Sequence, residues 1–306
     1  MDIQLANDII AMMPDERTVF RYHTDRYAIM LLEYAMTEGV SIAQLKGSRF
    51  AKLLNRPAVK DVVAQCGNGY LTPAELALAW PVQTQNYVLT LGLWGRRKPG
   101  HRGWYQTSRA GTNLVLQLNF DRGHDGAYKK LTQQYDDTHF FYDGHPINKK
   151  GRNTLSWARI DLDLDSGEAL IEELQNDWLR NAYDELSYVQ KSKEISPAIK
   201  TKLKRYVNEN LEPHVKTWSE AMLSAALFFL IEEIGIKEIW IHDFETGNRL
   251  KQIKWSKPPR SLYTSLPKKF CFEKVKQAPS FLHRSLNRKM RKRVDDGDET
   301  FWKLAV

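Results

Sequence analysis

Apolar and polar positions alternate between residues 155 and 178, where the chain reads LSWARIDLDLDSGEALIEELQNDW. A period of two is typical of a β-strand with one buried face. Gly tolerates a positive φ, so Ser166 and Gly167 predict a two-residue turn between two antiparallel strands. The residue pairs predicted to lie opposite each other are Asp165 with Glu168, Leu162 with Ile171, and Ile160 with Glu173.

This predicted hairpin has one solvated face and one apolar face. The solvated face is expected to carry Asp161, Asp163, Asp165, Glu168 and Glu172. The apolar face is expected to carry Ile160, Leu162, Leu164, Ala169 and Ile171, together with Glu173 and Gln175. A carboxylate on an apolar face is costly unless it is paired, and such positions are often functional. A three-residue loop would exchange the roles of Glu172 and Glu173, so the sequence indicates the pair.

Residues 1 to about 80 are predicted to form a helical region. Residues 25–39 and 41–54 are apolar on one face, and the second helix has Ser41 as its cap. Thr72, Pro73 and Glu75 form a capping box with Pro at the first helical position. Short helices with tight turns are typical of a small bundle, and a helix-turn-helix has the same pattern.

After residue 80 the sequence pattern changes from one typical of helices to one that includes strands. Strands are predicted at 87–93, 113–120 and 236–242, a long polar loop at 121–150, and a turn at 243–248. A basic helical segment covers 191–210, and a buried helix runs from Pro213 to Gly235. The expected fold class is α+β: an N-terminal helical region (1–80), then a domain (81–306) with a mixed, mostly antiparallel sheet, flanking helices and a basic C-terminal arm.

Charge favours an acidic partner. The 306 residues carry a net charge of +8. Two basic segments are candidates for phosphate or nucleic-acid contacts, and an exposed, solvated surface is the alternative for both. The residues expected to make these contacts are Arg96, Arg97, Lys98 and Arg102 in the first segment and Arg288 and Arg291 in the second. Nucleic acid, the phosphates of acyl-CoA and acidic proteins would all satisfy the charge, and the oligomeric state is not indicated.

The cysteines, the histidines and the apolar segments argue against disulfide-rich, zinc-binding, membrane and secreted proteins. Cys66 and Cys271 give neither a disulfide framework nor zinc spacing. His124, His139 and His145 stand among acidic residues, but no short metal motif is present. The longest apolar run, residues 221–231, is too short to span a bilayer, and residues 1–17 lack a secretory leader, so a cytoplasmic protein without membrane contact is expected.

Residues 171–178, IEELQNDW, resemble the motif I-E-E-x-Q-S-D-W of domains in polyvalent proteins of phages and mobile elements. Those domains continue with a helix that begins at a Trp and with a strand after a Gly. Residues 218–235 and 236–242 match these two features, and the likeness covers about residues 113–242. Asn176 stands where Ser is usual. The resemblance implies a context of phage or mobile-element conflict and names no activity.

The later half also resembles the GNAT-type N-acyltransferases. Residues 168–175, 219–234 and 236–242 are similar to their central strand, the following helix and the next strand. Residues 262–272 are similar to their last helix and turn. The resemblance implies acyl-CoA as a cosubstrate, Tyr263 as general acid, and Glu172 or Glu173, near Gln175, as base. The family binds the CoA pyrophosphate at a Gly-rich helix start, whereas residues 178–217 contain no Gly.

Three further interpretations stay open. A nucleic-acid-binding protein of phage or mobile-element conflict without catalysis is supported by the basic balance, the loop 96–105, the basic segment 284–293 and the motif at 171–178. The order of Arg21, then Gln106-Thr107-Ser108, then Glu173-x-Gln175 is similar to that of ADP-ribosyltransferases, although Arg21 is expected at a helix start and Gln175 replaces the final Glu. A metal-dependent nuclease would use Asp161, Asp163 and Glu172 on one face of the hairpin.

Overall fold

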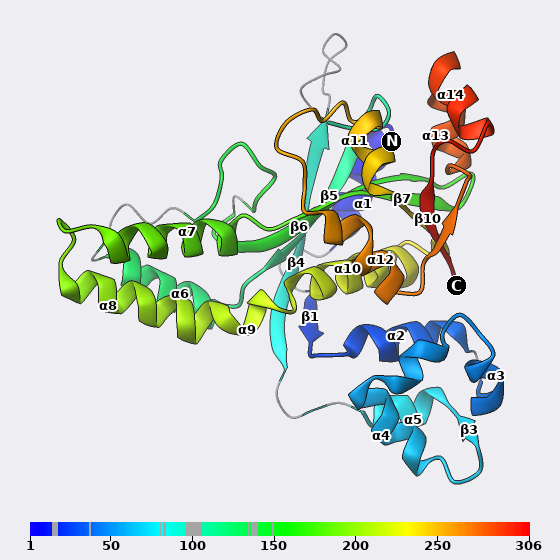
Figure 1. The fold of residues 1–306 in the computed structure, drawn as a ribbon, viewed down its shortest axis with the longest axis horizontal. Helices are drawn as coiled ribbons and strands as arrows, with labels where there is room; N and C mark the ends of the chain where they lie inside the picture. The colour runs from blue at the N-terminus through cyan, green and yellow to red at the C-terminus, as the bar shows by residue number, and fades with distance from the viewer. Residues whose placement is uncertain are drawn as a thin grey trace.

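An eight-stranded sheet in the order β1-β4-β5-β6-β7-β8-β10-β9 forms the centre of the computed structural model (Figure 1). The structure describes residues 1–306 except 14–17, 37, 80, 82–83, 96–105, 134, 136–139 and 149. The strands of this sheet are β1 (Val19–Tyr22), β4 (Gln85–Gly95), β5 (Thr112–Asn119), β6 (Thr154–Asp163), β7 (Glu168–Gln175), β8 (Glu238–His242), β9 (Glu273–Val275) and β10 (Phe301–Ala305). A separate pair consists of β2 (Val40–Ser41) and β3 (Tyr70–Leu71).

Helices occupy the connections between strands. They are α1 (Ile3–Met12), α2 (Arg26–Ala35), α3 (Ile42–Lys46), α4 (Pro57–Gln65), α5 (Pro73–Ala77), α6 (Arg122–Thr132), α7 (Trp178–Lys191), α8 (Pro197–Tyr206), α9 (Glu212–Val215), α10 (Trp218–Phe228), α11 (Phe244–Leu250), α12 (Ser265–Lys269), α13 (Ser280–Ser285) and α14 (Arg288–Asp295). Short 3₁₀ segments are η1 (Ala51–Asn55) and η4 (Arg260–Tyr263), and π segments are η2 (Val207–Leu211) and η3 (Phe229–Glu233). No helix in the described ranges has the length and apolar character needed to cross a bilayer.

The strand directions confirm the predicted fold class. Neighbouring strands are antiparallel throughout the sheet except for β7 and β8, which run parallel from the pair Glu168 and Glu238 to the pair Ile171 and Ile241. Beyond Ile171, β7 continues to Gln175 without pairing to β8. The carboxyl end of β7 therefore extends past the end of β8, at the edge of a parallel pair where α/β proteins commonly place a ligand.

Helices cover both faces of the sheet. The buried helix α10 packs against β5, β6 and β7 on one face and against α2 on its other side, and Ile160 and Ile171 belong to this core. On the opposite face, Phe281 of α13 and Val294 of α14 pack with Leu170 and Trp240 in a smaller core. Both faces of β7 and β8 are consequently covered, which explains their nearly continuous burial.

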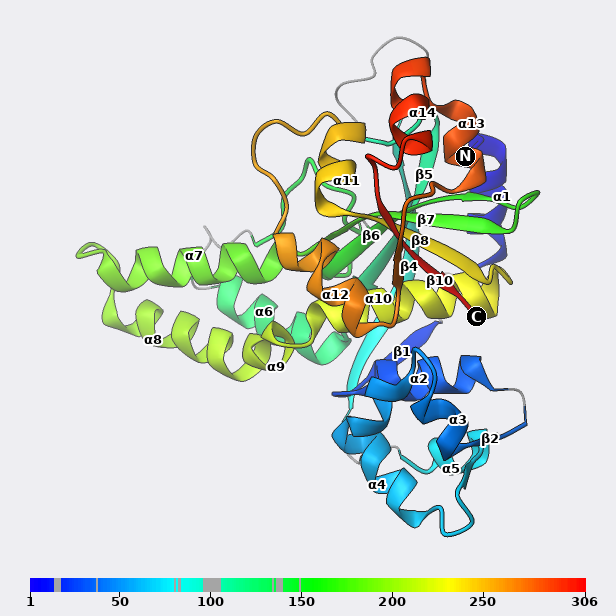
Figure 2. The ribbon, with the colours of Figure 1, turned by 45° about the vertical axis from the view of Figure 1, so that its right-hand side comes forward.

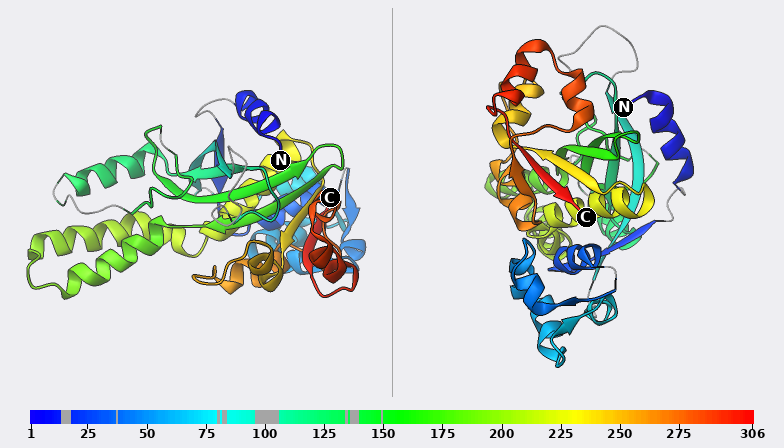
Figure 3. Two further views of the ribbon diagram at one scale, coloured as in Figure 1. Left: turned by 90° about the horizontal axis from the view of Figure 1, so that it is seen from above. Right: turned by 90° about the vertical axis from the view of Figure 1, so that its right-hand side faces the viewer.

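Three groups of helices surround the sheet. Helices α6, α7 and α8 project together beyond the strands as an arm (Figures 1 and 2). The segment from α2 to α5 lies at one end of the molecule, and α1 lies apart from it beside β4 and β5 (Figure 3). Arg49 and Lys52, near η1, reach the backbone carbonyls of Ala305 and Lys268. These contacts join the α2–α5 segment to the C-terminal part of the chain.

Several predicted elements are confirmed and others are wrong. Ser41 and Thr72 cap α3 and α5 with capping boxes, as the sequence indicates. Residues 1–80 are not wholly helical, because β1 pairs with β4 and β2 pairs with β3. The predicted loop at 121–150 contains α6, which Asp121 caps by accepting a hydrogen bond from the His124 N–H. The predicted turn at 243–248 is part of α11.

The predicted register of the hairpin is also wrong. Asp163 lies opposite Glu168, so residues 164–167 form a four-residue connection. The Ser166 hydroxyl donates to the Asp163 carboxylate (2.8 Å), and Gly167 has a φ of 65°. Leu164, expected on the apolar face, is 49% exposed in this connection.

Candidate functional site

A β-bulge in β7 determines where the two candidate carboxylates lie. Ile171 is opposite Ile160, whereas Glu173 is opposite Arg159, so Glu172 is an extra residue in β7. Side chains of opposite residues share a face, so Glu173 lies with Arg159 and away from the Ile160 core. Glu172 follows Ile171 and also points away from that core. The prediction that Glu173 shares the face of Ile160 is therefore wrong, because alternation does not detect a bulge.

Glu173 forms a buried ion pair with Arg159. The Arg159 guanidinium donates to Oε2 of Glu173 and, at 3.0 Å, to the backbone carbonyl of Gln106. Both residues are at least nine-tenths buried. Burial alone would raise the pKa of Glu173, but the charges of Arg159 and Lys251 outweigh it and lower this pKa. Glu173 is consequently an anion and a weak base.

Glu172 lies in a separate, fully buried network. The Ser108 backbone N–H and hydroxyl donate to its two oxygens (3.0 and 2.7 Å), and the same hydroxyl lies 2.6 Å from Nε2 of His242. Burial raises the pKa of Glu172 and lowers that of His242. Lys251 donates from Nζ to the Glu172 backbone carbonyl (2.7 Å). The predicted solvated position of Glu172 is wrong, because residues 106–111 cover it.

Asp161 and Glu168 of the predicted solvated face are buried as well. Asp165 is exposed, as expected, and Asp163 is half-buried. Asp161 accepts from the Met1 ammonium (2.6 Å) and from Nε and Nη2 of Arg109 (2.6 and 2.9 Å). Glu168 accepts from the Ser280 N–H and hydroxyl at the start of α13. These contacts satisfy carboxylates that the sequence placed in solvent, because α1 and α13 pack on this face.

A cavity of about 740 Å³ opens at the carboxyl end of β7, which extends past the end of β8. Its wall includes Glu173 and Gln175 of β7, Trp218 of α10, and residues 256–259 after α11. An adjoining cavity of about 420 Å³ reaches Trp94, Trp157 and Arg159 and shares Gln106, Tyr142, His145, Glu173 and Gln175 with the first. Glu173 and Gln175 therefore lie where the sequence placed a site, while Glu172 is behind the wall.

His145 in this wall forms an acid–histidine pair with Asp177, which is buried behind it. Nδ1 of His145 lies 2.6 Å from Oδ2 of Asp177, and the Gln175 amide donates to Oδ1 (2.9 Å). Burial would raise the pKa of Asp177, but the bond with His145 lowers it. An ionised carboxylate at this distance makes Nδ1 the donor of this hydrogen bond, and Nε2 is the ring nitrogen that does not contact Asp177. The His145 side chain is 25% exposed, and Asp177 is almost completely buried.

Tyr263 lies outside the cavity wall. It ends η4, is 3% exposed, and its ring lies 5.5 Å from Nζ of Lys251. Burial strongly raises the pKa of its hydroxyl. Its neighbour Leu262 lines the cavity. Of the segments that resemble the ADP-ribosyltransferase order, Gln106 lines the cavity with Glu173 and Gln175, but Arg21 does not join them. Arg21 lies on strand β1, not at a helix start as expected, and β4, β5 and β6 separate it from β7.

The basic candidates fall into two groups. Arg96, Arg97, Lys98 and Arg102 lie outside the described residues. Arg288 is exposed on α14, whereas Arg291 donates to the backbone carbonyls of Arg284 and Leu286 at 3.1 Å each. Arg291 thus also holds the end of α13.

No group of three or more His, Cys, Asp or Glu side chains in the described part of the chain is arranged to hold a metal ion. Of the histidines noted in the sequence, His124 lies 2.8 Å from the Tyr206 hydroxyl and stacks on Phe120, and His139 lies outside the described residues. The oxygens of Asp161, a nuclease candidate, already contact two cations.

Sequence reasoning missed Arg159, Asp177 and Lys251 as functional candidates, and it considered His145 only as a metal ligand. The basic residue within the apolar run 155–162 was a usable signal, because Arg in a buried strand needs a carboxylate partner. His145 and Asp177 are 32 residues apart in the chain, and no local pattern brings them together. Comparisons of the chain with protein-family models, curated proteins and solved structures gave no match.

Proposed function

We propose that this chain is an acyltransferase-type domain, similar in its later half to the GNAT enzymes, that acylates an amine. One observation carries the proposal: a cavity at the carboxyl end of β7, beyond the end of the parallel strand β8, has His145 in its wall, and this histidine is paired with the buried Asp177. The order β7, α10, β8 also agrees with the arrangement that the resemblance implies. A phage or mobile-element origin rests on the motif at 171–178 and is part of the same proposal.

The proposed chemistry is removal of a proton from an ammonium group. Nε2 of His145 accepts the proton, and the ionised Asp177 stabilises the imidazolium that results. Glu173 stays anionic because Arg159 lowers its pKa, so it supports binding of the cationic acceptor and is not the base. Glu172 helps to position the wall through its hydrogen bonds with Ser108 and Lys251. Tyr263 does so through its chain neighbour Leu262, which lines the cavity.

The start of α7 does not fit the pyrophosphate of an acyl-CoA. The Asp177 carboxylate stands at this helix start, and the Leu179 N–H already donates to Oδ1 of Asn176 (2.9 Å). A phosphate there would meet a like charge and would lack free backbone donors. The proposal therefore concerns the acceptor side of the reaction and leaves the acyl donor open beyond its being a thioester or another activated acyl compound.

The proposal is tested with the full chain, primary amines, and acetyl-CoA or S-acetyl-N-acetylcysteamine as donor. Amide formation is followed by mass spectrometry. His145→Ala is expected to lower the rate by about 100-fold, because general-base catalysis has about this value, whereas His283→Ala is expected to have no effect since His283 pairs with Asp295 on the surface. Absence of transfer from both donors at millimolar concentration, or equal rates in the two variants, refutes the proposal.

A second candidate is nucleic-acid binding without catalysis. Arg288, Lys289 and Lys292 are exposed on the eight-residue helix α14. No described residue forms an ion pair with any of them, unlike Arg293, which pairs with Glu299 and Asp298. Unpaired cations on one helix suit phosphate contacts.

A further inference from the structure

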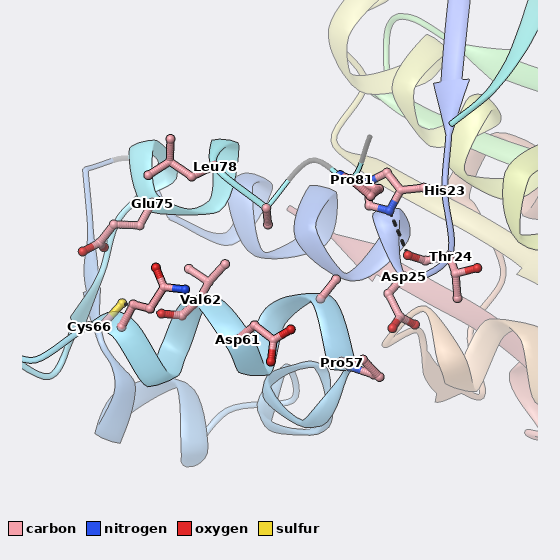
Figure 4. A pocket seen from close by; sticks show the side chains of 13 residues that line it. His23, Thr24, Asp25, Pro57, Asp61, Val62, Cys66, Glu75, Leu78 and Pro81 are labelled. Carbon is pink, nitrogen blue, oxygen red and sulfur yellow. Dashed lines mark hydrogen bonds between the residues drawn. The ribbon is translucent and has the colours of Figure 1, made fainter. Parts of the chain in front are cut away.

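A second cavity lies in the α2–α5 segment, apart from the site at β7. It has a volume of about 620 Å³ and lies between α4 and the region of α5, with residues 23–25 at one end (Figure 4). The side chains that enclose it come from separate turns of the chain, among them Asp25, Asp61, Glu75 and Leu78. No sequence motif marks it.

The charge of this cavity has a single sign. Asp25, Asp61 and Glu75 contribute carboxylates, and no Lys or Arg is among the described residues that line it. Glu75 already accepts hydrogen bonds from the Thr72 N–H and hydroxyl in the capping box of α5, so Asp25 and Asp61 are the carboxylates left for a ligand. His23 is the one titratable nitrogen in that wall, and burial lowers its pKa, so its ring is neutral. Three carboxylates without a lining cation stand out in a chain whose net charge is +8.

Asp25 is held in this wall at a conformational cost. Its φ of 69° lies in the left-handed region, which is uncommon for residues other than Gly. The residue is 5% exposed, yet no described residue donates a hydrogen bond or forms an ion pair to its carboxylate. A buried carboxylate needs a donor or a counter-ion. The Asp25 carboxylate in the cavity wall therefore lacks a partner among the described residues, and a cationic ligand in the cavity could supply one.

The remaining wall combines apolar side chains with the polar Thr24 and Gln65. Pro57, Ala58, Val62, Leu78 and Ala79 surround the carboxylates, and Leu78 is 82% exposed at the rim. A hydrated metal ion would gain nothing from such a wall, whereas a cation on a hydrocarbon chain would bury its methylene groups there. We propose that this cavity binds an alkylammonium or guanidinium group that ends an apolar chain, either as a free diamine or as a Lys or Arg side chain of a partner.

The test measures binding to the full chain by calorimetry. The probes are 1,5-diaminopentane, a short peptide with one central Lys, and pentanol as a neutral analogue. Asp25→Asn removes the charge and keeps a residue that tolerates a positive φ, so the backbone is expected to stay intact. Asp61→Asn removes an exposed carboxylate of the same wall, and Asp165→Asn, on the exposed hairpin connection, is the matched control.

At least one cationic probe is expected to bind, with affinity reduced about tenfold in Asp25→Asn and in Asp61→Asn, the usual scale for one charge-assisted contact. Asp165→Asn and the wild type should bind it equally, and pentanol should not bind. Binding of the diamine identifies a small molecule as ligand, and binding of the peptide alone identifies a protein partner. If neither probe binds at millimolar concentration, or if all variants bind alike, the inference is wrong. Acyl transfer at His145 is unaffected by either result.

Discussion

At the scale of residues, the ion pair between Arg159 and Glu173 controls the wall of the main cavity. Arg159 is 1% exposed, and its guanidinium also lies 5.4 Å from the centre of the Trp94 ring. A buried pair contributes modestly as a pair, but loss of one partner leaves an uncompensated charge in a medium of low dielectric constant. Substitution of either residue alone is therefore expected to destabilise the protein more than substitution of both together.

Glu173→Leu is expected to lower the free energy of unfolding by about 3 to 5 kcal/mol, because the guanidinium keeps its burial and loses its carboxylate. Urea denaturation at pH 7 measures this loss. The double variant Arg159→Met with Glu173→Leu is the control and should recover most of it. A single variant within about 1 kcal/mol of the wild type, the range of ordinary surface substitutions, would contradict this account.

At the scale of elements, α9 and α10 are joined to the sheet through His214. Nδ1 of His214 lies 2.7 Å from the Tyr87 hydroxyl of β4, and its ring meets Phe120 edge-on, with centroids 5.2 Å apart. Burial lowers the pKa of His214 to about 4, and His124 adds to this effect. The contact between these helices and the sheet thus requires a neutral imidazole.

The stability of this contact should depend on pH with a definite sign. The folded pKa of about 4 is below the unfolded value near 6.5, so the stabilisation is complete above pH 6.5 and is lost as pH falls toward 4. His214→Gln, which cannot be protonated, should lose less stability over this interval than the wild type. Thermal unfolding at pH 7, 5.5 and 4.5 measures the difference. His283→Gln serves as the surface control, and parallel curves for wild type and His214→Gln would exclude the effect.

At the scale of the whole molecule, charge is unevenly distributed. The net charge is +8, yet the cavity in the α2–α5 segment is lined by carboxylates, and exposed cations stand on α14. Because α14 packs through Val294 against Leu170 and Trp240, its cationic side is held rigidly on the sheet. This rigid placement is what the second candidate function requires.

Substitution of Arg288, Lys289 and Lys292 by Gln is expected to weaken retention on DNA or RNA and to reduce its salt dependence, because each phosphate contact releases counterions. Chromatography on immobilised nucleic acid at low and physiological salt measures both. Gln substitutions at Lys193, Lys204 and Arg205 on the α7–α8 arm remove the same charge and form the control. Retention that does not change with salt, or equal losses in both variants, would rule out α14 as the contact surface.

Local sequence was sufficient wherever neighbours in the chain decide the conformation. Ser41 and Thr72 cap helices because their side chains reach a backbone N–H three residues away. The alternation in 155–175 predicts two antiparallel strands, and burial of α10 follows from its apolar composition. The α+β class follows from this order of elements. A carboxylate pair in the central sheet was also predictable from Glu172 and Glu173.

Tertiary structure alone decided which partners those carboxylates have. The bulge at Glu172 comes from pairing with β6, and it turns Glu173 toward Arg159 and the cavity while Glu172 meets Ser108 and His242. Asp161 is buried because Met1 and Arg109 arrive from distant segments. Local periodicity reports how a strand presents its side chains, whereas burial and charge balance depend on what packs above them. The sequence by itself therefore determined the capped helices, the acidic strand and the fold class, and long-range packing determined the remaining elements and the site.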